Sequence, residues 1–158
     1  MKTSYFSKHG RRKFKGAISI AVGQPKYVVV KTVYGALAPS WNLLQDYRND
    51  NIDEDEYIER FKKQLAKLSP SVVHQDLSRL AGDSEPILLC HCGTEDFCHR
   101  HLVAEWLEEK LGIKIPEEEE NGITRAEGYL NYPEQLDMFD IIRMRTEDEQ
   151  DELAKEDE

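Results

Sequence analysis

The sequence predicts an α/β fold with one main domain. Short runs of branched apolar residues, of strand length, alternate along the chain with longer segments whose apolar residues recur at helical spacing. A chain of 158 residues with 39% hydrophobic residues can bury one core. We expect a small, three-layer, Rossmann-like sheet with flanking helices over residues 1–115. An irregular extension over 116–146 and a disordered acidic tail over 147–158 should follow, because these segments have little apolar periodicity.

The predicted strands are short and rich in branched residues. AISIAV (17–22) and YVVVKTV (27–33) are separated by GQPK, which marks a loop. EPILL (85–89) reads as a buried strand opened by a proline, and TSYF (3–6) resembles a strand near the N-terminus. We therefore expect several strands, most of them before residue 90.

Helices are predicted between and after these strands. Pro39 breaks any strand and favours a helix that starts at Ser40, with Trp41, Leu44 and Tyr47 on one face. A clearer helix follows, in which apolar residues recur at helical spacing: Tyr57, Ile58, Phe61, Leu65 and Leu68.

Capping and breaking residues set the ends of the later helices. Asp53 can cap the clearer helix, with Glu56 three residues on, and Ser69-Pro70 should end it. A further helix is expected over residues 71–80. The segment LVAEWLEEKLG (102–112) reads as the last helix, stopped by its terminal glycine.

The strongest functional signal is CHCGTEDFCHRH (90–101), which holds all three cysteines and three of the five histidines. It lies between a predicted strand and a predicted helix, where α/β proteins place their chemistry. If the helix begins before Cys98, its free N–H groups favour an anion and lower a thiol's pKa. Arg100 adds a donor fork suited to phosphate or carboxylate. We therefore expect an anion pocket with Cys98, His99 and Arg100 as candidate catalytic residues, and with Cys90 and Arg100 as candidate ligand-binding residues.

A helical wheel places His99 near the middle of the inward arc, with Cys98 and Arg100 at its edges. His101 points almost the opposite way, and we expect it to be a solvated surface histidine. The residues that define the inward arc are Leu102, Val103, Trp106 and Leu107.

Three other interpretations of this cluster stay open. Cys90, Cys92, Cys98 and His99 are soft ligands that suit zinc, although their spacing is not the paired two-residue gap of ordinary zinc motifs. His91-Cys92 before a helix suggests a cysteine phosphatase, but Cys98 occupies the position where that loop requires arginine. In the third interpretation Cys90 is a buried apolar residue and His99 a core histidine.

Charge is distributed unevenly along the chain, whose net charge is −10. Residues 1–45 carry eight Lys or Arg and no acid, so residues 46–158 carry a net −18. The basic residues are densest at KHGRRKFK (8–15), which we expect to be a polar loop that attracts phosphate, and Arg11, Arg12 and Ser40 are further ligand-binding candidates. A nucleotide or nucleic acid is the predicted partner, and a solvated loop that balances an acidic body is the alternative.

The composition favours a protein of the reduced cytoplasm. An odd number of cysteines in one loop makes no disulfide framework, and the N-terminus has no apolar run typical of a secretion signal. The longest apolar stretch, residues 17–22, is far shorter than the about 20 residues that cross a bilayer. We therefore expect no membrane association.

One pattern resembles the hallmark of domain-of-unknown-function family 488. It consists of Leu88-Leu89-Cys90, seven further residues, Cys98-His99-Arg100 and an apolar helix. The segments TSYF, AISIA, LAPSW and the helix after Asp53 are also similar to a shorter branch of that family, so the resemblance covers about residues 3–115. It implies a small three-layer α/β fold with a site around the two motif cysteines and no established reaction. His91 and Cys92 depart from the usual residues of this loop.

A second motif lies in the extension. QLDMF (135–139) is similar to the pentapeptide with which bacterial polymerases and repair proteins bind the sliding clamp. Leu136, Met138 and Phe139 can fill apolar pockets while Gln135 hydrogen-bonds nearby. The sequence therefore predicts a clamp contact in DNA metabolism, and the alternative is a final amphipathic element packed on the core.

Overall fold

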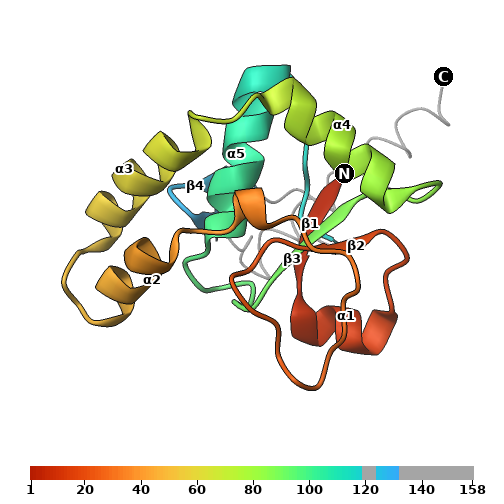
Figure 1. The fold of residues 1–158 in the computed structure, drawn as a ribbon, viewed down its shortest axis with the longest axis horizontal. Helices are drawn as coiled ribbons and strands as arrows, with labels where there is room; N and C mark the ends of the chain where they lie inside the picture. The colour runs from red at the N-terminus through yellow and green to blue at the C-terminus, as the bar shows by residue number, and fades with distance from the viewer. Residues whose placement is uncertain (119–123, 132–158) are drawn as a thin grey trace, which may run out of the picture.

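The computed structural model describes residues 1–118 and 124–131, and it has the predicted α/β fold (Figure 1). Its centre is a parallel sheet in the order β1-β3-β2, formed by β1 (Lys2–Tyr5), β2 (Ala17–Ser19) and β3 (Ile87–Cys90). All four residues of β3 are buried, as expected for a central parallel strand covered on both faces.

Helices and irregular segments cover the two faces of this sheet. One apolar cluster joins the sheet to α2–α5, and a second joins its other face to α1 and to the segment after β2. The result is a three-layer arrangement with the sheet in the middle. The helices are α1 (Phe6–Arg12), α2 (Trp41–Arg48), α3 (Glu54–Leu65), α4 (Pro70–Ala81) and α5 (His99–Leu111), with a 3₁₀ turn at Gly35–Leu37.

Three helix ends are marked by the predicted residues, although α3 ends at Leu65, before the predicted stop at Ser69-Pro70. Asp53 Oδ1 accepts the Glu56 N–H at 2.9 Å and caps α3. Pro70 occupies the first turn of α4, where its missing N–H costs nothing. Gly112 ends α5 with a φ of +65°, which glycine adopts without steric cost.

Two predictions about the N-terminal third are wrong. Residues 27–33 form no continuous strand, because both backbone polar groups of Val30 bond to the Gln24 side chain at 2.9 Å. An isolated parallel bridge between Val33 and Ser19 joins the end of the segment to β2. Residues 8–15 are not a polar loop, because α1 continues to Arg12. Phe6 is fully buried and Gly10 lets this helix pass close to Val28, so one face of the polar segment packs on the sheet.

The predicted apolar face of α2 is only partly correct. Trp41 is 60% exposed, whereas Leu43 is buried at 5%. Leu44 and Tyr47 are half-buried and line a pocket. Ser40 caps this helix, since its hydroxyl accepts the N–H of Leu43 at 3.3 Å.

A short hairpin lies within the extension that we expected to be irregular. It consists of β4 (Thr124–Ala126) and β5 (Tyr129–Asn131), and β4 packs against α5. The clamp-like motif at 135–139 and the acidic tail lie outside the described residues.

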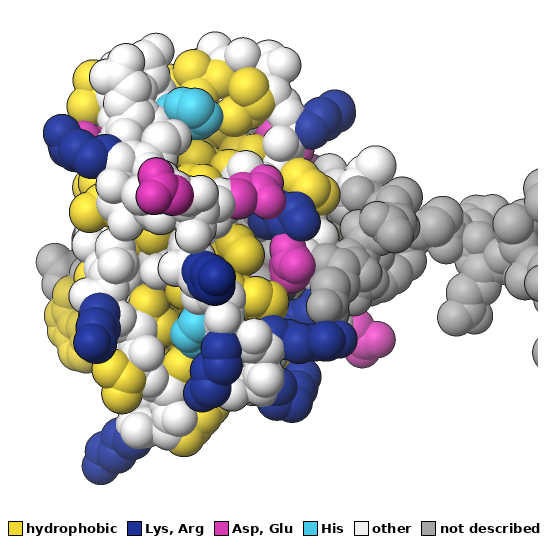
Figure 2. Space-filling model, turned by 90° about the vertical axis from the view of Figure 1, so that its right-hand side faces the viewer, with side chains coloured by type: hydrophobic (Ala, Val, Ile, Leu, Met, Phe, Trp, Pro, Cys, Tyr) yellow, Lys and Arg dark blue, Asp and Glu magenta, His cyan; other side chains and the backbone are white. Residues whose placement is uncertain are grey.

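Basic side chains gather on one part of the surface. Figure 2 shows Lys and Arg over the lower part of a face on which Figure 1 places α1. Most basic residues of the acid-free first 45 positions are exposed: Arg11, Arg12, Lys13, Lys15, Lys26 and Lys31. In the part of the chain that the structure describes, no helix has the length and apolarity needed to cross a membrane.

Candidate functional site

A cavity of about 120 Å³ opens at the carboxyl end of the sheet. The three parallel strands run in the same direction and end at Tyr5, Ser19 and Cys90, so the segments that follow them meet at one edge. Open α/β sheets bind their ligands at this edge. The cavity is lined by residues that follow β2 and β3 and by residues of α2 and α3.

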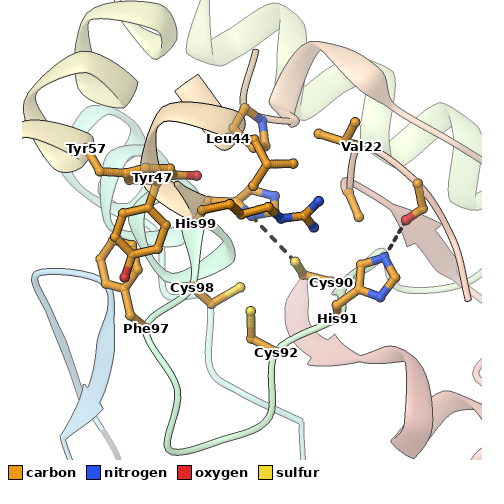
Figure 3. A pocket seen from close by; sticks show the side chains of 14 residues that line it. Val22, Leu44, Tyr47, Tyr57, Cys90, His91, Cys92, Phe97, Cys98 and His99 are labelled. Atoms are coloured by element: carbon orange, nitrogen blue, oxygen red, sulfur yellow. Dashed lines mark hydrogen bonds between the residues drawn. The ribbon is translucent and has the colours of Figure 1, made fainter. Parts of the chain in front are cut away.

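Three thiols lie together at this cavity (Figure 3). Cys90 ends β3, Cys92 lies on the following loop and Cys98 is the N-cap of α5. Their three sulfur atoms lie within 4.8 Å of one another. Cys90 and Cys98 are buried and Cys92 is half-buried, so the cluster is enclosed but reaches the cavity.

His99 joins this cluster from the first turn of α5. Its Nε2 lies 2.8 Å from the carbonyl oxygen of Ile20, and its Nδ1 lies 3.5 Å from Cys90 Sγ. A carbonyl only accepts hydrogen bonds, so Nε2 carries the proton and Nδ1 presents a lone pair to the thiol in the neutral ring. The edge of the ring packs on Phe61, which fixes its orientation.

Cys98 is the thiol of the cluster that ionises most readily. Burial acts to raise its pKa, but hydrogen bonds from the Cys90 and Cys92 thiols outweigh burial and hold the pKa of Cys98 well below its usual value. Hydrogen bonding to the other two thiols raises the pKa of Cys92, and burial adds to that effect. The cluster therefore favours one thiolate at the N-terminus of α5, where the helix dipole also stabilises negative charge.

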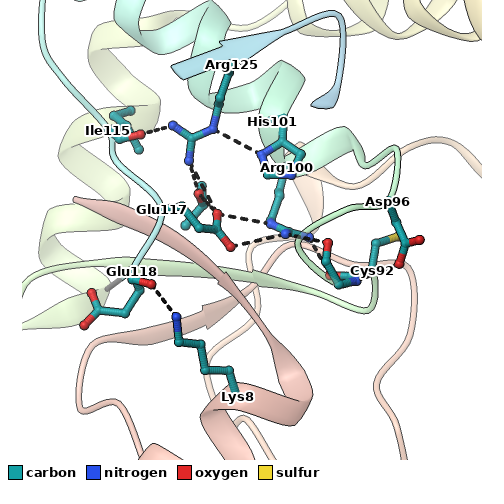
Figure 4. Close-up of polar contacts among 11 residues, drawn as sticks. Lys8, Cys92, Asp96, Arg100, His101, Ile115, Glu117, Glu118 and Arg125 are labelled. Carbon is teal, nitrogen blue, oxygen red and sulfur yellow. Dashed lines mark hydrogen bonds and ion pairs between the residues drawn. The ribbon is translucent and has the colours of Figure 1, made fainter. Parts of the chain in front are cut away.

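The structure does not place Arg100 where we expected it. Its side chain is fully buried, and its guanidinium donates to the carbonyl oxygens of Cys92 at 2.6 Å and Gly93 at 3.0 Å (Figure 4). It also pairs with Glu117 at 3.2 Å, with the Tyr5 ring below. All of these partners are protein groups, so Arg100 holds the cysteine loop in shape instead of offering its donor fork to a ligand.

His101 is also buried, which contradicts the prediction of a surface histidine. Its side chain is 0% exposed, and its Nδ1 accepts a hydrogen bond from Arg125 Nε at 3.1 Å. Burial and the positive charge of Arg100 lower its pKa to about 3, so the ring is neutral. The wheel argument failed because β4 covers the side of α5 that faces away from the sheet.

The hairpin also supports the cysteine loop directly. The carbonyl oxygen of Gly128 accepts the N–H of Cys98 at 2.9 Å. Gly128 has a φ of +87°, and a Cβ there would lie 2.4 Å from the Phe97 ring. Within the loop, Asp96 Oδ2 accepts the N–H of Gly93 at 3.0 Å. These contacts hold the backbone on both sides of Cys92 and Cys98.

Aromatic rings and one arginine complete the cavity. Phe97 packs against Tyr47 and Tyr57, with ring centroids 5.7 and 5.3 Å apart, and all three line the cavity. Arg48, exposed at the end of α2, is its only Lys or Arg, and no carboxylate is present among the described residues that line it. Sequence analysis missed Arg48, because no local pattern shows that the end of α2 reaches the cysteines.

The remaining predicted ligand-binding residues lie elsewhere. Arg11 and Arg12 are exposed on α1 and do not line the cavity. Ser40 uses its hydroxyl as a helix cap, and its neighbour Pro39 lines the cavity instead. His91 does line the cavity, but its Nε2 lies 2.6 Å from the carbonyl oxygen of Gly23, which ties the loop to the segment after β2.

The fold and the cysteine site define an α/β protein with a thiol cluster after its central strand. A family model described as "Active DUF488-N3 subclade" matches residues 13–111, which is more than half of the chain. The chain therefore belongs to the DUF488 family, in agreement with its Leu-Leu-Cys and Cys-His-Arg motifs. No curated protein and no solved structure matches the chain.

Proposed function

We propose that the chain binds a nucleotide unit, free or within a nucleic acid, with the base in the cavity and the phosphates near Arg48. The observation that carries this proposal is the lining of the cavity. Aromatic rings and Arg48 are present, and no carboxylate is found among the described lining residues. Aromatic rings stack on bases, and a guanidinium favours phosphate.

The size of the cavity limits what enters it. A volume of about 120 Å³ corresponds to about four waters at about 30 Å³ each, which is much less than a drug-sized pocket of about 300 Å³ or more. One flat ring fits this space better than a whole nucleotide. The sugar and phosphates would then remain outside, near the exposed Arg48. Cys98 and His99, which line the cavity, would face the bound ring.

Binding of labelled single-stranded DNA and RNA to the full chain, measured by fluorescence anisotropy at low and moderate salt, tests the proposal. Binding should weaken as salt rises, because phosphate contacts release counterions. Arg48→Ala should weaken binding to all sequences and lower the salt slope by about one. Competition with unlabelled mononucleotides separates a free nucleotide from a nucleic acid as the ligand.

Arg79→Ala is the matched control, because it removes the same charge from an exposed site on α4. It should leave binding unchanged. If Arg48→Ala and Arg79→Ala lost the same binding affinity, the net charge of the protein alone would determine binding, and the cavity would not be the site. Absence of binding at low salt would refute the proposal.

The segment QLDMF supports a second candidate function, which is docking on a sliding clamp. Three apolar side chains and one amide in five residues suit a short peptide anchored in pockets of a partner. A pull-down with purified clamp should recover the wild-type chain and lose the double variant Gln135→Ala and Phe139→Ala. Equal recovery of both would remove this candidate. Either function suits the cytoplasm, whose reducing conditions would keep the three thiols free.

A further inference from the structure

The geometry points to one zinc ion bound by Cys90, Cys92, Cys98 and His99. The inference goes beyond the proposed nucleotide binding and does not depend on it, because it needs only these four side chains. It gives the cysteines a structural role at the floor of the cavity, where the ion would join the end of β3 to the start of α5.

The distances within the cluster are close to those of a tetrahedral zinc site. Bonds of about 2.3 Å to sulfur and about 2.0 Å to nitrogen place two sulfurs about 3.8 Å apart, and a sulfur and a nitrogen about 3.5 Å apart. The three sulfurs lie within 4.8 Å of one another, and His99 Nδ1 is 3.5 Å from Cys90 Sγ. Movements of about 1 Å, within reach of side-chain rotation, would bring the three sulfurs to these distances. His99 lies outside the group of atoms that are all within 4.8 Å of one another, so its ring would have to move farther toward Cys92 and Cys98.

His99 is already oriented as a metal ligand. Histidines that bind a metal through one ring nitrogen usually donate the other N–H to a carboxylate or a backbone carbonyl, which fixes the ring. The bond from Nε2 to the carbonyl oxygen of Ile20 supplies this support at 2.8 Å. The Nδ1 lone pair then points to Cys90 (Figure 3).

The donor set selects zinc over harder cations. Three thiolates and one imidazole are soft or borderline ligands, whereas Mg²⁺ and Ca²⁺ require oxygen ligands. No carboxylate is present among the lining residues within 1–118 and 124–131. On binding, each thiol would lose its proton to solvent. Three thiolates and one Zn²⁺ would leave the site with a net charge of −1. The buried guanidinium of Arg100, which donates to the loop carbonyls, supplies positive charge beside the site.

The decisive measurement is the metal content of the full-length chain, purified under reducing conditions without chelator. We expect about one zinc per chain, as a four-ligand structural site requires. Replacement by Co²⁺ should give the absorption of thiolate-to-cobalt charge transfer and of tetrahedral cobalt. A chelator should lower the melting temperature of the wild-type chain, because metal bound only to the folded state stabilises it.

Two variants with a matched control test the ligand assignment. Cys92→Ser changes the half-buried cysteine, so it perturbs the fold least, and His99→Ala removes the imidazole. Each should weaken zinc affinity by at least about tenfold in competition with a chromogenic chelator. His91→Ala, in the same loop but bonded to Gly23, should keep wild-type affinity.

Three results would overturn the inference. The first is a reduced wild-type chain that contains no zinc and takes up none when zinc is added. The second is a loss of affinity in His91→Ala equal to that in His99→Ala. The third is a disulfide between two of the three cysteines in freshly isolated protein. The zinc measurements use no nucleic acid, so failure of the nucleotide proposal would leave their outcome unchanged. In the same way, a chain without zinc could still bind nucleic acid in the anisotropy assay.

Discussion

Removal of the charge of Glu117 should destabilise the protein strongly. Glu117 is 3% exposed, and its carboxylate lies 3.2 Å from Arg100 Nη2 and 3.5 Å from Arg125 Nη2 (Figure 4). Thr3 donates its hydroxyl to the same carboxylate. Glu117→Gln keeps the size of the side chain and removes its charge, so the change isolates the electrostatic contribution.

The magnitude follows from what remains after the substitution. Removal of one partner of a buried ion pair costs about 3–5 kcal/mol, because the other charge stays desolvated without compensation. Here two guanidiniums lose their shared partner, while the amide oxygen can still accept one hydrogen bond. We expect a loss of at least about 3 kcal/mol in the free energy of unfolding. For a domain of this size, that loss lowers the melting temperature by about 6–12 °C.

Urea denaturation followed by circular dichroism, under reducing conditions, measures this loss. Glu59→Gln is the control, because Glu59 pairs with Lys63 at 2.7 Å on the exposed surface of α3. It should cost no more than about 0.5 kcal/mol. A loss below about 1 kcal/mol in Glu117→Gln would refute the reasoning. Arg100 would then not depend on Glu117, and its guanidinium would again be a candidate ligand donor.

Three further substitutions have defined outcomes in the same denaturation assay. Gly128→Ala should lower the free energy of unfolding by about 1–3 kcal/mol, because its φ is +87° and the new Cβ meets the Phe97 ring. Gly23→Ala is the control and should cost little, because the space around Gly23 is open. Asp53→Ala should cost about 1 kcal/mol through loss of the α3 cap, and an unchanged stability would contradict the capping role. Burial lowers the pKa of His9 in the folded protein, and the charge of Lys13 lowers it further. As the pH falls below about 6.5, His9 is therefore protonated in the unfolded chain before it is protonated in the folded one. Wild-type stability should therefore decrease in that range, by up to about 1.4 kcal/mol per pH unit from this group, and His9→Gln should show a shallower decrease; parallel curves would contradict it.

Local signals in the sequence predicted those parts of the fold that local chemistry determines. The side chain of Asp53 caps the start of α3, and the backbone of Gly112 ends α5. These two helix ends could therefore be predicted from short segments. Residues 27–33 have the composition of a strand, but the backbone of Val30 bonds to the side chain of Gln24, six residues earlier, instead of to another strand. β-propensity does not show which partner a backbone group finds, so this segment could not be predicted correctly.

The same distinction applies to the site. The cysteine loop and His99 were predictable, because the strand before them and the helix after them determine where the loop lies. The burial of Arg100 and His101 was not predictable, since the groups that cover them, Glu117 and Arg125, come 17 and 24 residues later in the chain. A helical wheel assumes one buried face, and α5 is covered on two sides.

The elements that seal Arg100 lie outside the region that defines the family. The family match covers residues 13–111, whereas Thr3, Glu117 and Arg125 fall before or after it. The matched region thus supplies the thiols, His99 and Arg100, and the flanking segments turn Arg100 inward onto the loop carbonyls. A related chain with the same Cys-His-Arg motif but without these flanking charges would leave the guanidinium without a carboxylate partner, held by the two loop carbonyls alone and open to an added anion. The motif alone therefore does not determine whether its arginine supports the loop or contacts a ligand, and in this chain the residues around it assign Arg100 to the loop.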